Sequence, residues 1–104
     1  MYQQAIGESK KAIEVDPDLG NPYNDIGAYL IEIRHIDEAI TWLEKAKVAK
    51  RYKARHYPYH YLGRIYERLG EWGKAMEEYK GALRVLPEFE AAKQSLIRIQ
   101  SMMN

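Results

Sequence analysis

The chain has 104 residues with a formal net charge of +1, and 46% of its residues are hydrophobic while 30% are charged. This length and composition are typical of one small globular domain, and the balanced charge favours neither nucleic acid nor membrane surfaces as a general partner. Because there is no cysteine, disulfide frameworks, thiol nucleophiles and the common cysteine-based zinc sites are excluded. No apolar run approaches the roughly 20 residues that span a bilayer, and residues 1–4 lack the start of a secretory signal, so we expect a cytoplasmic location.

Apolar residues recur at three- and four-residue steps along nearly the whole chain, which predicts an all-α fold. The first run ends at Asp16-Pro17, because proline cannot continue a helix and restricts the residue before it. The next run begins at Asn21-Pro22, where asparagine is a good N-cap and proline suits the first helical position. In chain order, helices are expected over residues 2–15, 21 to about 34, 37–50, 58–69, 73–85 and 88–102.

Part of the chain repeats itself, since residues 21–27 align with residues 57–63. The step from Gly27 to Gly63 is slightly longer than a helical repeat period of about 34 residues. The sequence therefore predicts a short insertion near residues 50–56.

The repeated glycines have a physical reason. Glycine in a helix interior costs roughly 0.5–1 kcal/mol relative to alanine, so close packing has to compensate. We expect Gly27 and Gly63 to lie where the two helices of a pair cross, facing Ala39 and Ala75.

The most regular pattern lies in residues 59–87. Large residues recur before and after Gly70, which suits the left-handed end of a helix, and small residues stand where two helices would touch. The residues of this pattern are Tyr59, Leu62, Gly63, Tyr66, Gly70, Trp72, Ala75, Tyr79, Ala82 and Pro87. Their spacing resembles the tetratricopeptide repeat, a helix–turn–helix unit of helical repeat proteins.

This resemblance implies a short right-handed solenoid of antiparallel helix pairs, with about five helices including a C-terminal capping helix. Lys93 and Ile97 stand where the repeats have tyrosine and glycine, which suits a terminal helix without a close partner on its outer side. On the family pattern, the chain is a single domain that consists of a half repeat (1–19), two repeats (20–53 and 54–87) and the capping helix (88–104).

The resemblance also implies a protein–protein interaction scaffold that binds a peptide or a segment of another protein in a concave groove. The first helices of the repeats line such a groove. His60, Arg64 and Arg98 would favour an acidic ligand through charge-assisted hydrogen bonds. The expected groove residues are Asn21, Asn24, Ile31, Tyr57, His60, Arg64, Glu67, Gln94 and Arg98.

A nucleic-acid-binding module is the alternative function. Basic residues are concentrated in residues 45–55, and tyrosines interleave with them there and just beyond. Basic residues together with aromatic rings can bind nucleic acid. A solvated loop with ordinary helix charges explains the same composition, and we therefore prefer the protein-binding interpretation.

We expect no enzyme, cofactor or metal site. No serine lies in the setting of a nucleophile, and neither standard glycine-rich phosphate loop is present. His56 and His60 have the spacing of a helical metal site, but no third ligand is evident near them. Packing or groove histidines are the simpler interpretation.

Two further expectations concern partners. The resemblance implies that family members which bind chaperone C-termini do so through a clamp of lysine, arginine and asparagine side chains. The positions of this chain that we matched to the clamp carry no cation, which argues against a chaperone tail as ligand. Those positions are Asn24, Ala28, Tyr61, Ala91 and Ser95. The first helix would also expose Tyr2, Ala5, Ile6 and Ser9, which suggests weak self-association through that helix.

Overall fold

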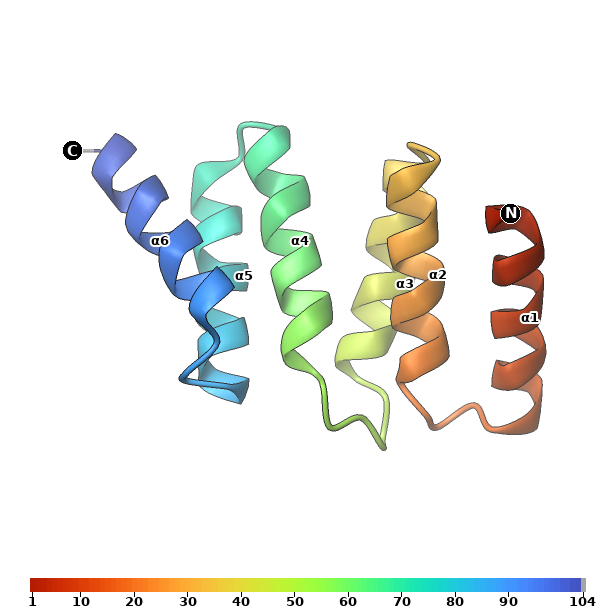
Figure 1. The fold of residues 1–104 in the computed structure, drawn as a ribbon. Coiled ribbons are helices and arrows are strands. Elements are labelled where there is room, and N and C mark those ends of the chain that lie inside the picture. Colours follow the sequence, from red (N-terminus) through yellow and green to blue (C-terminus); the bar gives the residue numbers. More distant parts are fainter. Residues whose placement is uncertain (104) are drawn as a thin grey trace.

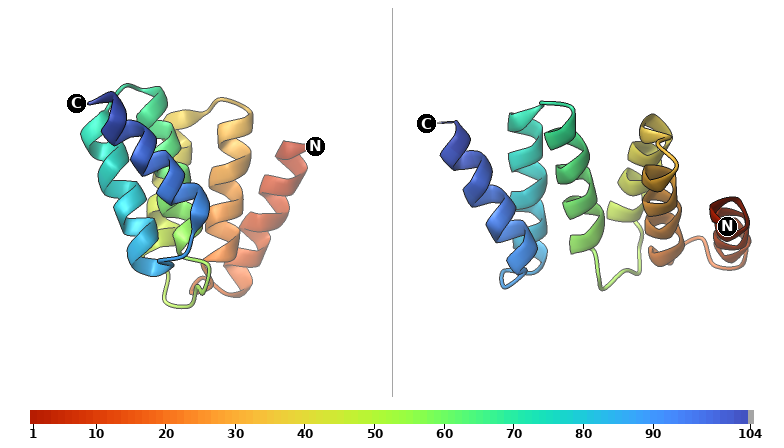
Figure 2. Two further views of the ribbon diagram at one scale, coloured as in Figure 1. Left: turned by 60° about the vertical axis from the view of Figure 1, so that its left-hand side comes forward. Right: turned by 45° about the horizontal axis from the view of Figure 1, so that its top comes forward.

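The computed structural model describes residues 1–103, which form six α-helices stacked in one row (Figure 1). The helices are α1 (Tyr2–Val15), α2 (Asn21–Glu32), α3 (Ile36–Lys47), α4 (His56–Arg68), α5 (Trp72–Val85) and α6 (Glu90–Met102). The first and last helices lie at opposite ends of the row in Figure 1 and in the right-hand view of Figure 2, and the molecule measures 47 × 26 × 18 Å.

The prediction of an all-α fold built from antiparallel helix pairs is confirmed. The pairs are α2–α3 and α4–α5, with α1 packed on α2 and α6 packed on α5. The described residues contain six helices, which are the six ranges expected from the sequence: one in the half repeat, two in each pair and one in the cap. Residue 104, the end of the predicted capping segment, lies outside the described residues. None of the helices in residues 1–103 is long and apolar enough to cross a membrane.

The ends of several helices differ from the prediction. α3 ends at Lys47 rather than near Lys50, because the Lys47 carbonyl accepts a hydrogen bond from the Arg55 side chain. α4 begins at His56 rather than at residue 58, and Pro58 is tolerated there because the first turn of a helix needs no N–H donor. α6 begins only at Glu90, after the extended N-cap residue that precedes it.

The connection between α3 and α4 is longer than the connections before α2 and before α6. It is attached to the α1–α2 connection by two backbone hydrogen bonds. The Arg51 N–H donates to the Asp18 carbonyl at 2.9 Å, and the Gly20 N–H donates to the Arg51 carbonyl at 2.9 Å. The Tyr52 side chain is buried beneath this segment. These residues therefore form an ordered support for the two loops at that end of the row.

The core consists of two clusters joined by Tyr66, which packs against both. The first lies between α1, α2, α3 and α4, and the second lies between α4, α5 and α6. The fully or nearly buried members of the first are Ile26, Leu30, Ala39, Leu43, Leu62 and Ile65. Those of the second are Ala75, Tyr79, Ala82, Ala92 and Ile99.

The interhelix glycines do lie at close crossings, but the side chains opposite them were not predicted. A Cβ atom at Gly27 would lie 2.5 Å from Leu43 Cδ2, and a Cβ atom at Gly63 would lie 2.6 Å from Tyr79 Cε1. Of the two predicted alanines, Ala39 approaches Gly27 only with its backbone carbonyl. Each glycine therefore makes room for a large buried side chain of the partner helix.

The turns inside the two helix pairs have the same backbone geometry with different residues. Gly70 between α4 and α5 has φ 73°, and Arg34 between α2 and α3 has φ 64°. In both turns the next residue donates to a carbonyl in the preceding helix, His35 to Leu30 at 2.8 Å and Glu71 to Tyr66 at 2.9 Å. A left-handed backbone costs a residue other than glycine about 1–2 kcal/mol.

The first helix covers part of the face that was expected to be exposed. Ile6 and Ile13 pack against the first core cluster, and the Tyr2 ring lies 5.8 Å from the Tyr29 ring of α2. The apolar stripe of α1 faces α2, and Lys10 also reaches the Trp42 ring of α3. Ile6 is therefore half-buried, whereas Tyr2 stays 42% exposed, so only part of the expected face is covered.

Candidate functional site

Two neighbouring hollows lie along the side of the molecule formed by α2, α4 and α6. The first hollow, of about 740 Å³, lies between α2 and α4. The second hollow, of about 460 Å³, lies between α4 and α6. Arg64 and Arg68 of α4 line both. The two hollows are therefore adjacent, with Arg64 and Arg68 on their common border, and together they form a groove across three helices.

The first hollow combines apolar walls with exposed arginines. Its apolar and aromatic lining includes Tyr29, Ile31, Ile36, Tyr61, Ile65 and Leu69. Arg34, Arg64 and Arg68 bring three positive charges to it, and Glu32 brings one negative charge. Among residues 1–103, none of these three guanidinium groups forms an ion pair. This half of the groove can thus hold an apolar group and an anion side by side.

The second hollow contains a polar network that is satisfied internally. Glu67 accepts a hydrogen bond from the Tyr79 hydroxyl at 2.8 Å and one from Arg98 Nη2 at 3.2 Å. Burial, together with the hydrogen bond to Glu67, raises the pKa of Tyr79 to about 12. The positive charge of Arg98 is therefore already compensated within the chain.

His60 lies at the edge of the second hollow but is held mainly by aromatic neighbours. Its ring centroid is 5.2 Å from that of Phe89 and 5.6 Å from that of Tyr79. Burial lowers the pKa of His60 to about 4, with Arg64 and His56 acting in the same direction and Glu67 against them. At neutral pH His60 is thus an uncharged packing residue.

His56 also contacts Phe89, with 4.8 Å between ring centroids, and burial lowers its pKa. The two histidines therefore hold Phe89, just before α6, against α4. Among the residues described, no group of three histidine, aspartate or glutamate side chains is placed to hold a metal ion.

The structure brings five of the nine expected groove residues into the walls of the groove. Ile31 lines the first hollow, Arg64 lines both, and the rest line the second. The residues in the second hollow are His60, Arg64, Glu67 and Arg98.

The other four expected residues line neither hollow. Asn24 is only 8% exposed, and its Oδ1 has no hydrogen-bond partner within the described chain. Tyr57 stacks against His56 and Phe89, with ring centroids 4.2 Å and 6.0 Å away. Gln94 donates to Glu90 at 3.1 Å on the surface of α6, and Asn21 is exposed at the start of α2.

Several groove residues were not predicted. Arg68 lies one turn after Arg64 on the same helix, so helical spacing could have identified it. Arg34 lies in a turn and Trp72 directly follows one. At such places the spacing of apolar residues does not predict which way a side chain points. Tyr61, which was matched to a position of the chaperone clamp, also lines the first hollow.

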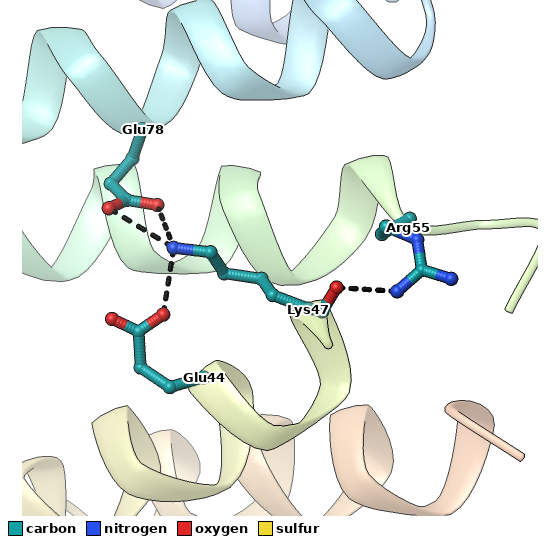
Figure 3. Close-up of polar contacts among 4 residues, drawn as sticks. All are labelled: Glu44, Lys47, Arg55 and Glu78. Carbon is teal, nitrogen blue, oxygen red and sulfur yellow. Dashed lines mark hydrogen bonds and ion pairs between the residues drawn. The ribbon is translucent and has the colours of Figure 1, made fainter. Parts of the chain in front are cut away.

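The basic segment of residues 45–55 is largely engaged in contacts within the chain. Lys47 Nζ donates to Glu78 Oε1 at 3.1 Å and lies 2.7 Å from Glu44 Oε1, so it bridges α3 and α5 (Figure 3). The Lys47 and Glu78 side chains are each only 16% exposed. Burial opposes the charge of Lys47, but the hydrogen bonds to Glu44 and Glu78 outweigh it and raise the pKa of Lys47.

Other cations of this segment are engaged as well. Arg55 donates to the carbonyl of Lys47 (Figure 3), and Arg51 forms an ion pair with Asp16. Lys45 lies 4.5 Å from the centre of the Trp42 ring. Lys47 and Arg51 are therefore paired with acids, whereas no ion pair of Lys45, Lys50, Lys53 or Arg55 is found among residues 1–103. The basic segment is thus only partly neutralised, and the nucleic-acid alternative stays a prediction.

Comparison with known proteins gives one family and several similar folds. A family model described as the tetratricopeptide repeat matches residues 56–89. No curated protein matches the chain.

Three solved structures show how far the similarity extends. The Arabidopsis OM64 TPR domain is similar with a TM-score of 0.82 at 21% identity, over 96% of this chain and 81% of that one. The first TPR of Spaghetti (RPAP3), bound to the HSP90 peptide SRMEEVD, is similar with a TM-score of 0.83 at 18% identity, over 98% of this chain and 79% of that one. MamA gives 0.83 at 26% identity, over 98% of this chain and 58% of that one.

Proposed function

Because the chain is a tetratricopeptide repeat protein, we propose that it is a protein-interaction module that binds a segment of another protein along α2, α4 and α6. The observation that carries this proposal is that the two hollows lie next to each other and share Arg64 and Arg68 in their linings. A groove across three helices suits an extended or helical segment better than a small molecule. Domains of this family are typically non-catalytic, and we propose no reaction.

Residues 20–53 and 54–87 are, in this proposal, the two repeats that carry the groove, preceded by the half repeat of residues 1–19 and followed by the cap. The family model's match to residues 56–89 supports the second repeat. A cytoplasmic location stays a prediction.

An acidic segment is the proposed ligand. The first hollow has three arginines and one glutamate in its lining, whereas the acid in the second hollow is already paired with Arg98. Positive charge that is unpaired within the described chain favours carboxylates through charge-assisted hydrogen bonds.

The absence of a chaperone tail as ligand stays a prediction, although the second hollow does contain arginines. Ala91 and Ser95, matched to clamp positions without a cation, line the second hollow together with Arg64, Arg68 and Arg98. The Spaghetti domain is similar to this chain in fold, and its bound HSP90 peptide is a property of that protein. Whether this chain takes a free C-terminus is therefore one arm of the test.

The test measures binding of the full chain to a library of labelled acidic peptides and to random RNA by fluorescence anisotropy. Micromolar binding of peptides is expected, together with at least a tenfold loss in Arg64→Glu, because Arg64 lines both hollows. Arg84→Glu is the matched control, since Arg84 lies in the last turn of α5 and lines neither hollow.

Several outcomes would contradict the proposal. It fails if no peptide binds, or if Arg64→Glu binds as tightly as the wild-type chain. Tight RNA binding with a steep dependence on salt would favour the nucleic-acid alternative instead. The affinity of the peptide SRMEEVD is compared with that of the same peptide amidated at its C-terminus. Weaker binding of the amidated form would show that the chain binds a terminal carboxylate.

Weak self-association through α1 stays a prediction. Ile6 is half-buried against the first core cluster, while Tyr2 on the same helix is 42% exposed.

A further inference from the structure

We propose that the first hollow selects the acidic segment and that Arg34 is the residue that reads its carboxylate. This inference rests on the proposed function. It adds which of the two hollows distinguishes acidic segments from other segments. The occupant is a protein segment that places a bulky apolar side chain next to an aspartate or glutamate.

The backbone of Arg34 is the first argument. Arg34 is the only residue other than glycine with a positive φ among residues 1–103, and the equivalent turn of the other helix pair has Gly70. Both turns make the same hydrogen bonds to the preceding helix, so glycine would serve the fold at either place. Backbone strain of this kind is found at functional sites, where the side chain is needed for another purpose.

Attraction to the helix dipole does not explain the choice. A cation near the C-terminus of α2 is favourable. The C-cap residue of α2 is Ile33, with φ −93°, and a basic residue there would gain the same attraction without a left-handed backbone. The helix dipole therefore does not account for an arginine at position 34. At this position in the turn, the arginine lines the first hollow.

The charge around Arg34 is the second argument. Arg34, Arg64 and Arg68 approach the same hollow from α4 and from the α2–α3 turn, and within the described chain none of them is paired with an acid. Arginine residues left without partners at the edge of an apolar pocket are suited to carboxylates, because the guanidinium group can donate two parallel hydrogen bonds.

The apolar wall of the same hollow is the third argument. Tyr29 and Tyr61 are half-buried and Ile65 is buried, so the hollow offers aromatic and aliphatic surface directly beside the arginines. Aromatic rings of this kind are effective anchors for an apolar side chain. The combination defines a ligand with an apolar residue and an acid in adjacent positions.

The probe is a synthetic peptide library with a central leucine or phenylalanine whose flanking positions are glutamate, glutamine or lysine. Dissociation constants are measured for the best glutamate peptide and for its glutamine match, on the full chain and on Arg34→Ala, Arg34→Gly, Arg34→Lys and Arg84→Ala. The wild-type chain is expected to prefer the glutamate peptide by about tenfold. Arg34→Ala and Arg34→Gly should lose most of this preference, Arg34→Lys should keep part of it, and Arg84→Ala should keep it all.

A second measurement needs no ligand. Arg34→Gly should raise the melting temperature by about 4–8 °C, because glycine accepts the left-handed backbone. Arg34→Ala keeps the strain and should show no such rise. The variant that is more stable would therefore be the one that binds acidic peptides less selectively.

The outcomes separate the two proposals. If peptides bind the wild-type chain but Arg34→Ala keeps the preference for glutamate, the inference is wrong while the proposed function stands. The same holds if the preference disappears only in Arg98→Ala, because the second hollow would then be the selecting half. If no peptide of the library or of the wider acidic set binds, the proposed function fails and the inference fails with it.

Discussion

The two helix pairs α2–α3 and α4–α5 share one backbone plan but differ in the side chain that fills the glycine crossing. In the first pair Leu43 lies against Gly27, and in the second Tyr79 lies against Gly63. The Tyr79 hydroxyl reaches out of the core to Glu67, which in turn holds Arg98 of α6. Leucine has no such group.

This difference shows how one buried position can influence the neighbouring surface. In the second hollow, the residue opposite the glycine supplies a donor that helps to satisfy the charges locally. In the first hollow, the arginines are without acid partners among residues 1–103 and are available to a ligand. The two pairs thus differ in whether the residue opposite the glycine carries a polar group that reaches the surface.

Enlarging the glycine at the crossing should have the largest effect on this comparison. Gly63→Leu should destabilise the chain by about 3 kcal/mol, because the new side chain meets the rigid, fully buried Tyr79 ring. Gly27→Leu should cost less, since Leu43 can change its rotamer. The free energy of unfolding in urea measures both.

Gly7→Leu is the matched control, because nothing lies within 4 Å of a Cβ atom at Gly7 in α1. It should be neutral or slightly stabilising, since leucine is the better helix former. Equal losses at Gly27 and Gly63 would show that the two crossings are packed alike, contrary to the comparison.

Removing the ion pair between the two helix pairs should have the next largest effect. Lys47→Met leaves the mostly buried Glu78 without its partner and should cost about 2–3 kcal/mol. Burial already raises the pKa of Glu78 in spite of Lys47, so the carboxylate is poorly solvated. Thermal or urea unfolding measures the loss.

A double variant shows whether the loss has this cause. Lys47→Met combined with Glu78→Leu should recover most of the stability, because no unpaired charge then remains in the interface. Arg51→Met, which removes an exposed ion pair, should change little. A double variant no more stable than Lys47→Met would show that packing, and not charge, holds the pairs together.

Acid should destabilise the second pair through His60. The pKa of His60 is lowered to about 4 in the folded chain, against about 6.5 when unfolded. The unfolded state therefore binds the proton more readily, and stability is complete above pH 6.5 and decreases as the pH falls toward 4. The expected loss across this window is about 2 kcal/mol after allowance for partial exposure.

The measurement is urea unfolding at several pH values between 4.5 and 7. His60→Gln should flatten the profile relative to the wild-type chain. Parallel profiles for the wild-type chain and His60→Gln would contradict the assignment.

The smallest effect is expected at the two turns. Gly70→Ala should cost about 1 kcal/mol, because alanine must adopt the left-handed backbone there. Arg34→Ala should leave stability nearly unchanged, because Arg34 already carries that cost. Equal losses in the two variants, read from melting temperatures, would show that the turns are not strained differently.

Much of the fold could be predicted from the sequence because its signals are local. The end of α1 before Asp16-Pro17 and the start of α2 at Asn21-Pro22 follow from the covalent geometry of proline. The close crossings at Gly27 and Gly63 follow from the repeat of a residue that is unfavourable in an isolated helix.

The site was predicted less completely. Arg64 follows from its place on the first helix of a repeat, but Asn24, expected on the same kind of face, is buried. A small rotation of a helix about its axis is enough to exchange a groove position for a core position, and spacing alone does not set that rotation.

The sequence by itself determined the helices, their order and the places where two helices must approach closely, because periodicity and the stereochemistry of proline and glycine act within a few residues. Only the tertiary structure decided which charges remain unpaired. Lys47 finds Glu78 and Glu67 finds Arg98 across 31 residues of sequence in each case. Arg34 reaches the first hollow only because its turn adopts a left-handed backbone. Pairing across the fold depends on how the helices are rotated against each other, and no local pattern contains that information.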